Sequence, residues 1–290
     1  MYKDQLGVTW YKVGLHIHTT LSDGRVSPQE MAAIYKEAGF DAVAITDHWK
    51  YYPEDEIDGL RIISGCEYNL GGADTAQGVM HIVGIGMRED PKIVRENTTY
   101  QQTIDAINAS GGMAVLAHPA WSLNTKDDIK PLHGFSLLEI YNTVSDVHQS
   151  CRPYSGYIVD ALANDGITYP LIATDDTHYY DGTDETKSFI MVKAKSGSVA
   201  DILDAIRHKE FYASQGPELY IRRNGRKISV SCSECNVICF ITNASWAAGR
   251  IVRGKDLTCA EYEMKDFEKW VRVEIADKNG KYAWSSMITL

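Results

Sequence analysis

The sequence lacks long apolar runs. No stretch approaches the roughly 20 consecutive apolar residues that span a bilayer, and the first residues, MYKDQLGVTWYK, lack the apolar centre of a signal peptide. We therefore expect a soluble, cytoplasmic protein that has no membrane partner.

Positive charge is also scarce, because 29 lysines and arginines face 39 aspartates and glutamates, which gives a net charge of -10. Proteins that bind nucleic acids usually do so by neutralising the phosphates with lysine and arginine side chains. The balance argues against a nucleic-acid partner and makes an exonuclease less attractive, but it does not exclude a small phosphorylated substrate. It predicts nothing about the oligomeric state.

Several other patterns are missing. The sequence has no internal repeat and no GxSxG motif, so it lacks the nucleophile elbow of the α/β-hydrolases. The CxxC formed by Cys232 and Cys235 has no second pair or well-spaced histidine, so buried strand thiols are favoured over a zinc site. In a reducing compartment all six cysteines are expected to be free thiols: Cys66, Cys151, Cys232, Cys235, Cys239 and Cys259.

What the first 216 residues do contain is an alternation of strand-like and helix-like segments. The clearest helix is 28–38, where Ser27 and Glu30 form a capping box and Gly39 follows the end; weaker helices are predicted at 98–110, 154–165 and 198–210. Such alternation implies parallel pairing, and seven or eight units can close into an α/β barrel. The predicted strands are 13–18, 41–46, 60–66, 79–85, 112–117, 136–141, 170–174 and 188–193.

After Gly216-Pro217 the pattern changes to strands alone. Asn224-Gly225 and Asn279-Gly280 are two-residue turn signals between strand-like runs. We therefore predict two domains, a barrel over 1–216 and a small all-β domain over 217–290.

Imidazoles and carboxylates gather at or near the ends of the predicted strands. Because side chains at strand ends converge at one rim of a barrel, nitrogen and oxygen donors in this pattern predict a multi-metal site and metal-assisted hydrolysis. The candidate ligands are His16, His18, Asp23, His48, Glu67, His81, His118, Asp176 and His178.

The local sequence bears on how single members of this set are placed and on which of two adjacent residues is the ligand. His16 and His18 lie one residue apart, which places both on one face of a strand. Asp176 is preferred over the adjacent Asp175 because its spacing to His178 matches a same-face pair. Two further residues could take part in catalysis: Asp47 could orient an imidazole or protonate the leaving group, and Arg152 could bind a phosphate or be a solvated surface arginine.

The motifs HIHTTLSDG, AITDH, GCE, HIVGIG, AHP and TDDTH, in this order, resemble those of the PHP (polymerase and histidinol phosphatase) superfamily. The resemblance covers about residues 13–215 and implies a distorted (βα)7 TIM-like barrel with up to three metals. The β-rich tail resembles the C-terminal region of one branch, whose members are mostly predicted phosphoesterases.

The resemblance also implies three ligand sets. By position, the first metal would be held by His16, His18, Glu67 and Asp176, the second by Glu67, His81 and His118, and the third by Asp23, His48 and His178. Glu67 would bridge the first two. Asp23 stands where many relatives have histidine, which changes the charge and hardness of the third site.

The resulting hypothesis is a cytoplasmic metal-dependent phosphoesterase that uses two to three divalent ions (Zn, Mn or Fe) to activate a water against a small phosphate ester. Its catalytic residues would be Glu67, Asp47 and Arg152. One alternative is a carboxylic ester or amide hydrolase that uses the same metals. Another is a non-catalytic, metal-stabilised scaffold whose β tail binds a partner.

Overall fold

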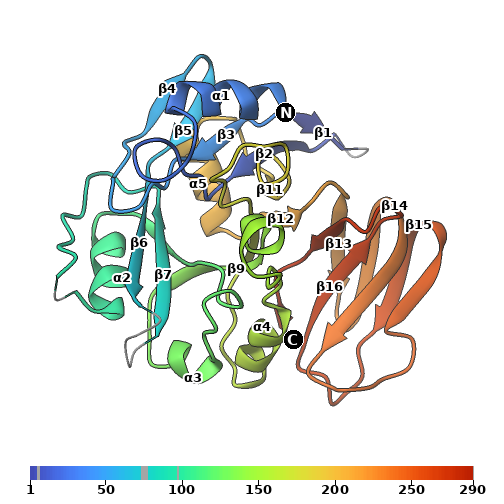
Figure 1. The fold of residues 1–290 in the computed structure, drawn as a ribbon. Coiled ribbons are helices and arrows are strands. Elements are labelled where there is room, and N and C mark those ends of the chain that lie inside the picture. The colour runs from blue at the N-terminus through green and yellow to red at the C-terminus, as the bar shows by residue number, and fades with distance from the viewer. Residues whose placement is uncertain (5–6, 73–77, 97, 290) are drawn as a thin grey trace.

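The computed structural model describes residues 1–4, 7–72, 78–96 and 98–289. Its strands form two sheets, and helices connect several strands along the chain (Figure 1). The 5-stranded sheet has the order β10-β9-β8-β7-β6. Its strands are β6 (Gly65–Gly71), β7 (Val79–Ile85), β8 (Met113–Leu116), β9 (Phe135–Asn142) and β10 (Leu171–Thr174).

The 13-stranded sheet contains the remaining strands of the first 216 residues and continues into the C-terminal strands. Within it, β12, β11, β2, β3, β5 and β4 are successive neighbours, and β1 pairs with β2. These strands are β1 (Tyr2–Lys3), β2 (Thr9–Gly14), β3 (Ala42–Ala44), β4 (Asp55–Ile57), β5 (Leu60–Ile63), β11 (Phe189–Val192) and β12 (Phe211–Ser214).

Seven of the eight expected strands are present, but the one expected at 13–18 lies earlier in the chain, at Thr9–Gly14, so His16 and His18 follow a strand instead of lying on it. Uniform parallel pairing is also wrong. Parallel ladders join β2, β3 and β5, and also β8, β9 and β10. In contrast, β6–β7, β7–β8 and β2–β11 pair antiparallel. Only residues 72–78 separate β6 from β7 in the sequence, and a parallel pair would need a longer crossover. Two isolated parallel bridges, Ile17 to Thr177 and His48 to Glu67, connect the two sheets.

The helices lie close to their predicted positions. α1 (Pro28–Glu37) begins with the predicted Ser27–Glu30 capping box, and Met31 and Tyr35 on it are buried. Among the described residues no helix is long and apolar enough to cross a membrane. The helices that follow α1 are α2 (Tyr100–Ala109), α3 (Lys126–Ile129), α4 (Gly156–Asn164), α5 (Val199–Arg207) and a π-helical turn, η1 (Ser145–Gln149).

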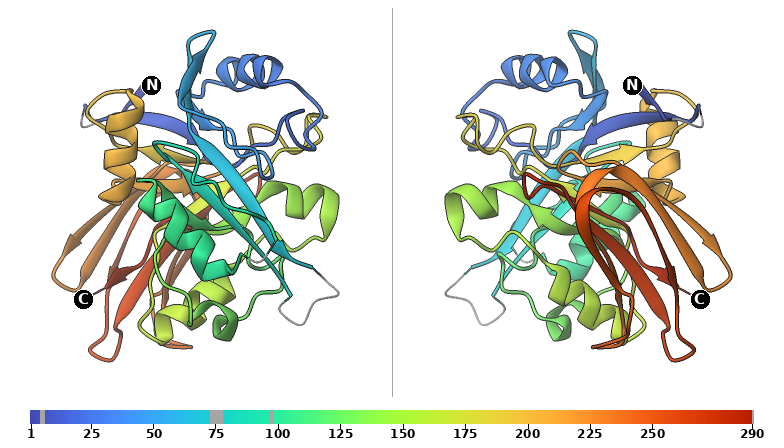
Figure 2. Two further views of the ribbon diagram at one scale, coloured as in Figure 1. Left: turned by 90° about the vertical axis from the view of Figure 1, so that its left-hand side faces the viewer. Right: turned by 90° about the vertical axis from the view of Figure 1, so that its right-hand side faces the viewer.

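The described residues after Gly216 form strands and turns and no helix. Both predicted hairpins are confirmed, since Asn224 pairs with Lys227 and Ala276 pairs with Tyr282. These strands lie together beside the rest of the molecule (Figure 2). They are β13 (Leu219–Asn224), β14 (Lys227–Thr242), β15 (Ile251–Glu263), β16 (Trp270–Ala276), β17 (Tyr282–Trp284) and β18 (Ile288–Thr289).

The C-terminal strands are joined to the preceding chain in two ways. β17 pairs with β12, so one sheet runs through both regions. In addition, the fully buried Arg272 on β16 donates to both carboxylate oxygens of Asp160 on α4, at 2.6 and 2.9 Å, and also contacts Glu274. Most of the buried apolar residues of these strands nevertheless form a separate cluster around Phe240 and Val273.

Candidate metal centre

The structure brings the nine candidate ligands together from both sheets. His16 and His18 follow β2, and His48 follows β3. Glu67 and His81 lie within the neighbouring strands β6 and β7. His118 follows β8, while Asp176 and His178 follow β10. Together with Asp23, these residues form three overlapping groups in which the donor atoms of each group lie within 4.8 Å of one another.

The first group contains His16, His18, Glu67 and Asp176, all of them buried. The Nε2 atoms of both histidines lie 3.0–3.2 Å from Glu67 Oε2 and from Asp176 Oδ1. Both Nε2 atoms and Asp176 Oδ1 are buried without a hydrogen-bond partner among the described residues. Ligands at about 2.1 Å from a common ion stand about 3.0–3.4 Å from one another. The spacing and the unpaired donors therefore fit a cation between these side chains.

The second group uses the other oxygen of Glu67. Oε1 of Glu67 lies 2.8 Å from His81 Nδ1 and 3.4 Å from His118 Nε2. Its Oε2 faces the first group, so one buried carboxylate faces two sets of donors. A carboxylate can bind two cations at once because each oxygen supplies its own lone pairs.

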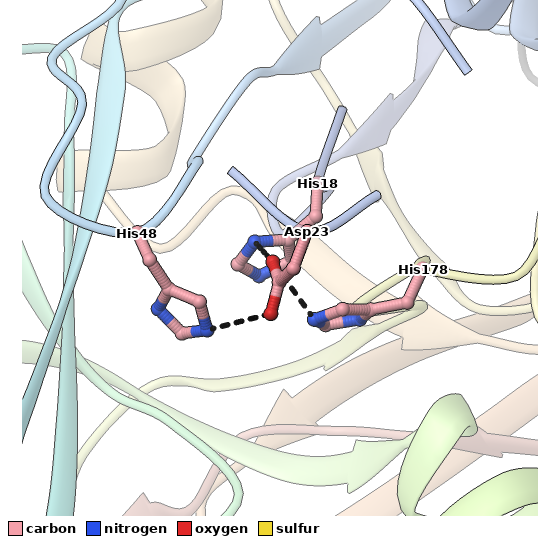
Figure 3. A group of neighbouring side chains, drawn as sticks. All are labelled: His18, Asp23, His48 and His178. Atoms are coloured by element: carbon pink, nitrogen blue, oxygen red, sulfur yellow. Dashed lines mark ion pairs between the residues drawn. The ribbon is translucent and has the colours of Figure 1, made fainter. Parts of the chain in front are cut away.

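The third group centres on Asp23 and includes His18, His48 and His178 (Figure 3). Asp23 Oδ1 lies 3.5 Å from His18 Nδ1 and 3.5 Å from His178 Nε2, and Oδ2 lies 3.7 Å from His48 Nε2. His18 directs Nε2 at the first group, while its Nδ1 lies 3.4 Å from Ser22 Oγ on the same loop as Asp23. This group is more open, since the Asp23 side chain is 54% exposed.

Asp47 organises the loop that carries Asp23. Its fully buried carboxylate accepts hydrogen bonds from the amides and hydroxyls of Thr19 and Ser22, at 2.6–3.0 Å. It does not line the cavity and orients no imidazole among the described residues. The roles of imidazole partner and of acid for the leaving group therefore do not fit Asp47, because its oxygens are already committed to the loop.

Glu139 is the carboxylate that orients an imidazole. Fully buried in β9, it lies 2.7 Å from His16 Nδ1 through Oε1. Its Oε2 accepts from the His118 amide at 2.8 Å and from the Asn142 side chain at 3.0 Å. Hydrogen bonds of this kind fix the tautomer of a ligating histidine. Glu139 thus keeps the proton on Nδ1 and leaves Nε2 of His16 free for the first group.

The two adjacent aspartates after β10 face different surroundings. Asp176 joins the first group, and its φ of 55° is a left-handed conformation that a non-glycine residue adopts at some cost. Asp175 instead accepts hydrogen bonds from Tyr35 and from the amides of Lys187 and Ser188. Burial raises the pKa of Asp175 to about 7. The structure therefore places Asp176 in the centre and Asp175 outside it.

The electrostatics of the groups reflect this crowding. Burial opposes charge on His18, but hydrogen bonds and attraction from Asp176 and Glu67 outweigh it and raise its pKa to about 10. The same balance raises the pKa of His16. Burial dominates at His48 and lowers its pKa to about 4. The pKa of Glu67 falls despite its burial, because the surrounding histidines stabilise the carboxylate.

The centre opens into a cavity of about 450 Å³. Four of its lining residues were not predicted from the sequence: Arg25, Trp121, Gln149 and Tyr179. Arg152 is exposed and does not line it, which favours the alternative of a solvated surface arginine. The sequence did hold a sign that Arg25 would lie at the cavity, because it follows the segment Ser22–Gly24, which contains the candidate ligand Asp23. The other lining residues are Asp23, His48, Glu67, His81, His118, Asp176 and His178.

A fourth group of potential donors, His148, Asp181 and Asp184, lies nearby. The buried Asp184 already accepts from three consecutive amides, those of His178, Tyr179 and Tyr180, at 2.7–2.9 Å. These bonds shape the loop after β10, so the geometry assigns Asp184 to loop structure.

Comparison with known proteins places the chain in a family. The PHP domain family model matches residues 14–137. An uncharacterized protein of Methanocaldococcus jannaschii is 30% identical over 120 residues, which cover 37% of this chain and 67% of that protein. Asp176 and His178 lie beyond the part matched by the family model, yet the fold brings them into the same centre.

Two solved structures share the fold. A two-domain protein of Bacteroides vulgatus, containing a predicted PHP-like metal-dependent phosphoesterase, is 18% identical and covers 100% of this chain and 98% of its own, with a TM-score of 0.54. A lesion-specific endonuclease of Pyrococcus furiosus is 16% identical and covers 69% of this chain and 56% of its own, with a TM-score of 0.50. The motifs, the family match and the shared fold agree: the chain belongs to the PHP domain family.

Proposed function

We propose that this protein is a metal-dependent phosphoesterase that hydrolyses a small phosphate ester with water as the nucleophile. The observation that carries the proposal is Glu67, a buried carboxylate whose two oxygens face separate groups of donors at the base of an open cavity. A scaffold would need neither the bridging carboxylate nor the open side.

The proposed ligands divide as the motifs imply, and a mixed nitrogen and oxygen donor set suits Zn, Mn or Fe. When bound, two to three such ions supply a water of lowered pKa and offset charge on the phosphoryl oxygens. In this proposal His16, His18, Glu67 and Asp176 hold the first ion, Glu67, His81 and His118 the second, and Asp23, His48 and His178 the third.

Other residues of the chain keep these donors in place. Glu139 holds the proton of His16 on Nδ1, and Asp47 holds the loop of Asp23. Gly24 closes this loop against the backbone of His18, where a Cβ would lie 2.4 Å from the His18 carbonyl oxygen. The centre therefore depends on backbone contacts that a side chain at position 24 would break.

The test is turnover by metal-loaded protein on matched phosphate monoesters, phosphate diesters and carboxylic esters, with Glu67→Gln as the variant. We expect phosphate ester hydrolysis that falls at least about 100-fold in Glu67→Gln, because a neutral amide cannot bridge two cations. Glu234→Gln, an exposed change on β14, is the matched control. Circular dichroism verifies that both variants fold.

The outcomes separate the alternatives. Turnover of the carboxylic esters alone would identify the ester or amide hydrolase, and no turnover by wild-type protein on any panel would favour the scaffold. Because an endonuclease shares this fold, single- and double-stranded oligonucleotides belong in the panel. Their cleavage in preference to small esters would overturn the proposed small substrate.

We also propose the domain division at 216/217, with residues 1–216 as the distorted (βα)7 barrel and 217–290 as a β-rich appendage. The two bridges that join the sheets at Ile17–Thr177 and His48–Glu67 support the barrel. The separate apolar cluster around Phe240 supports the appendage.

A further inference from the structure

Arg25 is the one arginine or lysine among the described residues that lines the cavity. Three carboxylates, those of Asp23, Glu67 and Asp176, share this lining. Arg25 nevertheless forms no ion pair with any carboxylate of the described part of the chain, and its side chain is exposed. An unpaired guanidinium in a cavity is available to bind an anion that enters from solvent.

The backbone around Arg25 is fixed to the metal centre. The Arg25 amide donates to the His178 carbonyl oxygen at 2.9 Å. The preceding Gly24 packs directly on the His18 backbone. The backbone of Arg25 is therefore tied to the third group, which includes both His18 and His178.

The side chain of Arg25 is held by an aromatic ring. Its guanidinium lies 4.6 Å from the ring centroid of Tyr179, which also lines the cavity. Tyr179 is itself stacked on His148, with ring centroids 3.9 Å apart, and His148 contacts Thr183 at 2.8 Å. Stacking restricts the guanidinium but leaves its N–H donors, which lie in its plane, free to bind a ligand.

We infer that Arg25 is the residue that binds the anionic oxygens of the substrate, and that Tyr179 positions it for this role. The inference rests on the proposed function and specifies its substrate: an ester that presents a phosphate dianion, or a second anionic group, at the Arg25 side of the cavity. A guanidinium matches two such oxygens with parallel hydrogen bonds, which an ammonium group cannot do.

A solvated surface arginine is the competing interpretation. Arg152 fits it, because that side chain is exposed and outside the cavity. Arg25 differs in its cavity position, in the ring contact with Tyr179 and in the backbone bond to His178. The ring contact and the backbone bond orient the residue before a ligand arrives, which lowers the entropic cost of binding.

The experiment is calorimetric titration of metal-loaded protein with inorganic phosphate, using wild type, Arg25→Met, Arg25→Lys, Arg152→Met and Arg222→Met. Arg222 is an exposed arginine on β13 and serves as the matched control. Hydrogen bonds to a charged group are worth enough to expect a loss of about 10- to 100-fold in phosphate affinity for Arg25→Met. Arg25→Lys should lose less, and Arg152→Met and Arg222→Met should stay within about twofold of wild type.

Metal content and circular dichroism of each variant show whether the fold and the centre persist. Phosphate affinity of Arg25→Met equal to that of wild type would overturn the inference, as would an equal loss in Arg222→Met. Wild-type protein that binds no phosphate would also overturn it. If wild type binds phosphate through Arg25 but hydrolyses no phosphate ester, the proposed function fails, while the anion-binding role of Arg25 stands.

Discussion

Replacing Glu139 with glutamine tests how the protein keeps His16 ready for a cation. Glutamine has nearly the same size, so the fold should persist. Its one oxygen can still accept from the His118 amide and the Asn142 side chain, as Oε2 of Glu139 does. The amide nitrogen then faces His16 Nδ1, where Oε1 now lies at 2.7 Å.

This change reverses the tautomer of His16. Because an amide nitrogen only donates, Nδ1 must accept, and the imidazole proton moves to Nε2. That atom lies 3.2 Å from Glu67 Oε2 and 3.1 Å from Asp176 Oδ1, so the proton would occupy the place of the first cation. Removing such outer partners usually costs 10- to 100-fold in metal affinity or activity, which is about 1.4 to 2.8 kcal/mol.

Metal affinity of Glu139→Gln is measured by competition with a coloured chelator, and bound metal by elemental analysis. Glu234→Gln, an exposed change on β14 that alters none of the candidate ligands, should bind metal as wild type does. Equal metal affinity in Glu139→Gln and wild type would refute the role assigned to Glu139. Loss of the folded signal in circular dichroism would show that Glu139 supports the fold instead.

Two further predictions concern the tail and the charge of the centre. Arg272→Met should lower the free energy of unfolding by about 3 kcal/mol in urea denaturation, because it leaves Asp160 without its partner. The control, Lys193→Met, changes an exposed lysine and should lower the free energy of unfolding by less than about 1 kcal/mol. Similar losses in both variants would contradict a stabilising role for the Arg272–Asp160 ion pair. Burial opposes charge on His18, but hydrogen bonds and attraction from Asp176 and Glu67 raise its pKa to about 10, so its imidazole is protonated near pH 7 without metal, and metal binding should release protons and strengthen as pH rises. Calorimetry in buffers of different ionisation enthalpy counts these protons, and heats that do not depend on the buffer would disprove the release.

Much of the fold could be predicted from local patterns. The capping box at Ser27 and Glu30, the turns at Asn224-Gly225 and Asn279-Gly280, and the apolar runs depend on neighbours in sequence, and the structure confirms them. The direction of pairing could not be predicted in the same way. The antiparallel β6, β7 and β8 depend on contacts between whole strands, which the sequence pattern does not specify.

The donor residues of the centre were also visible in the sequence, but their partners were not. Asp47 directly precedes the candidate ligand His48 in the sequence, yet in the structure its carboxylate accepts hydrogen bonds from Thr19 and Ser22. Glu139 contacts His16, which is 123 residues away, and no local pattern of the sequence specifies that contact. Such partners are set by the distance between side chains after folding.

By itself, the sequence determined which donors exist and that most of them lie near strand ends, because ligand chemistry is a property of residue type and strand positions follow from local apolar patterns. Only the tertiary structure decided that Glu67 directs one oxygen to each of two groups, that Asp175 faces away while Asp176 faces in, and that Arg25 rather than Arg152 reaches the cavity. The physical reason is that coordination, orientation and access depend on distances of a few ångströms between atoms far apart in the chain. Those distances are fixed only when the two sheets come together.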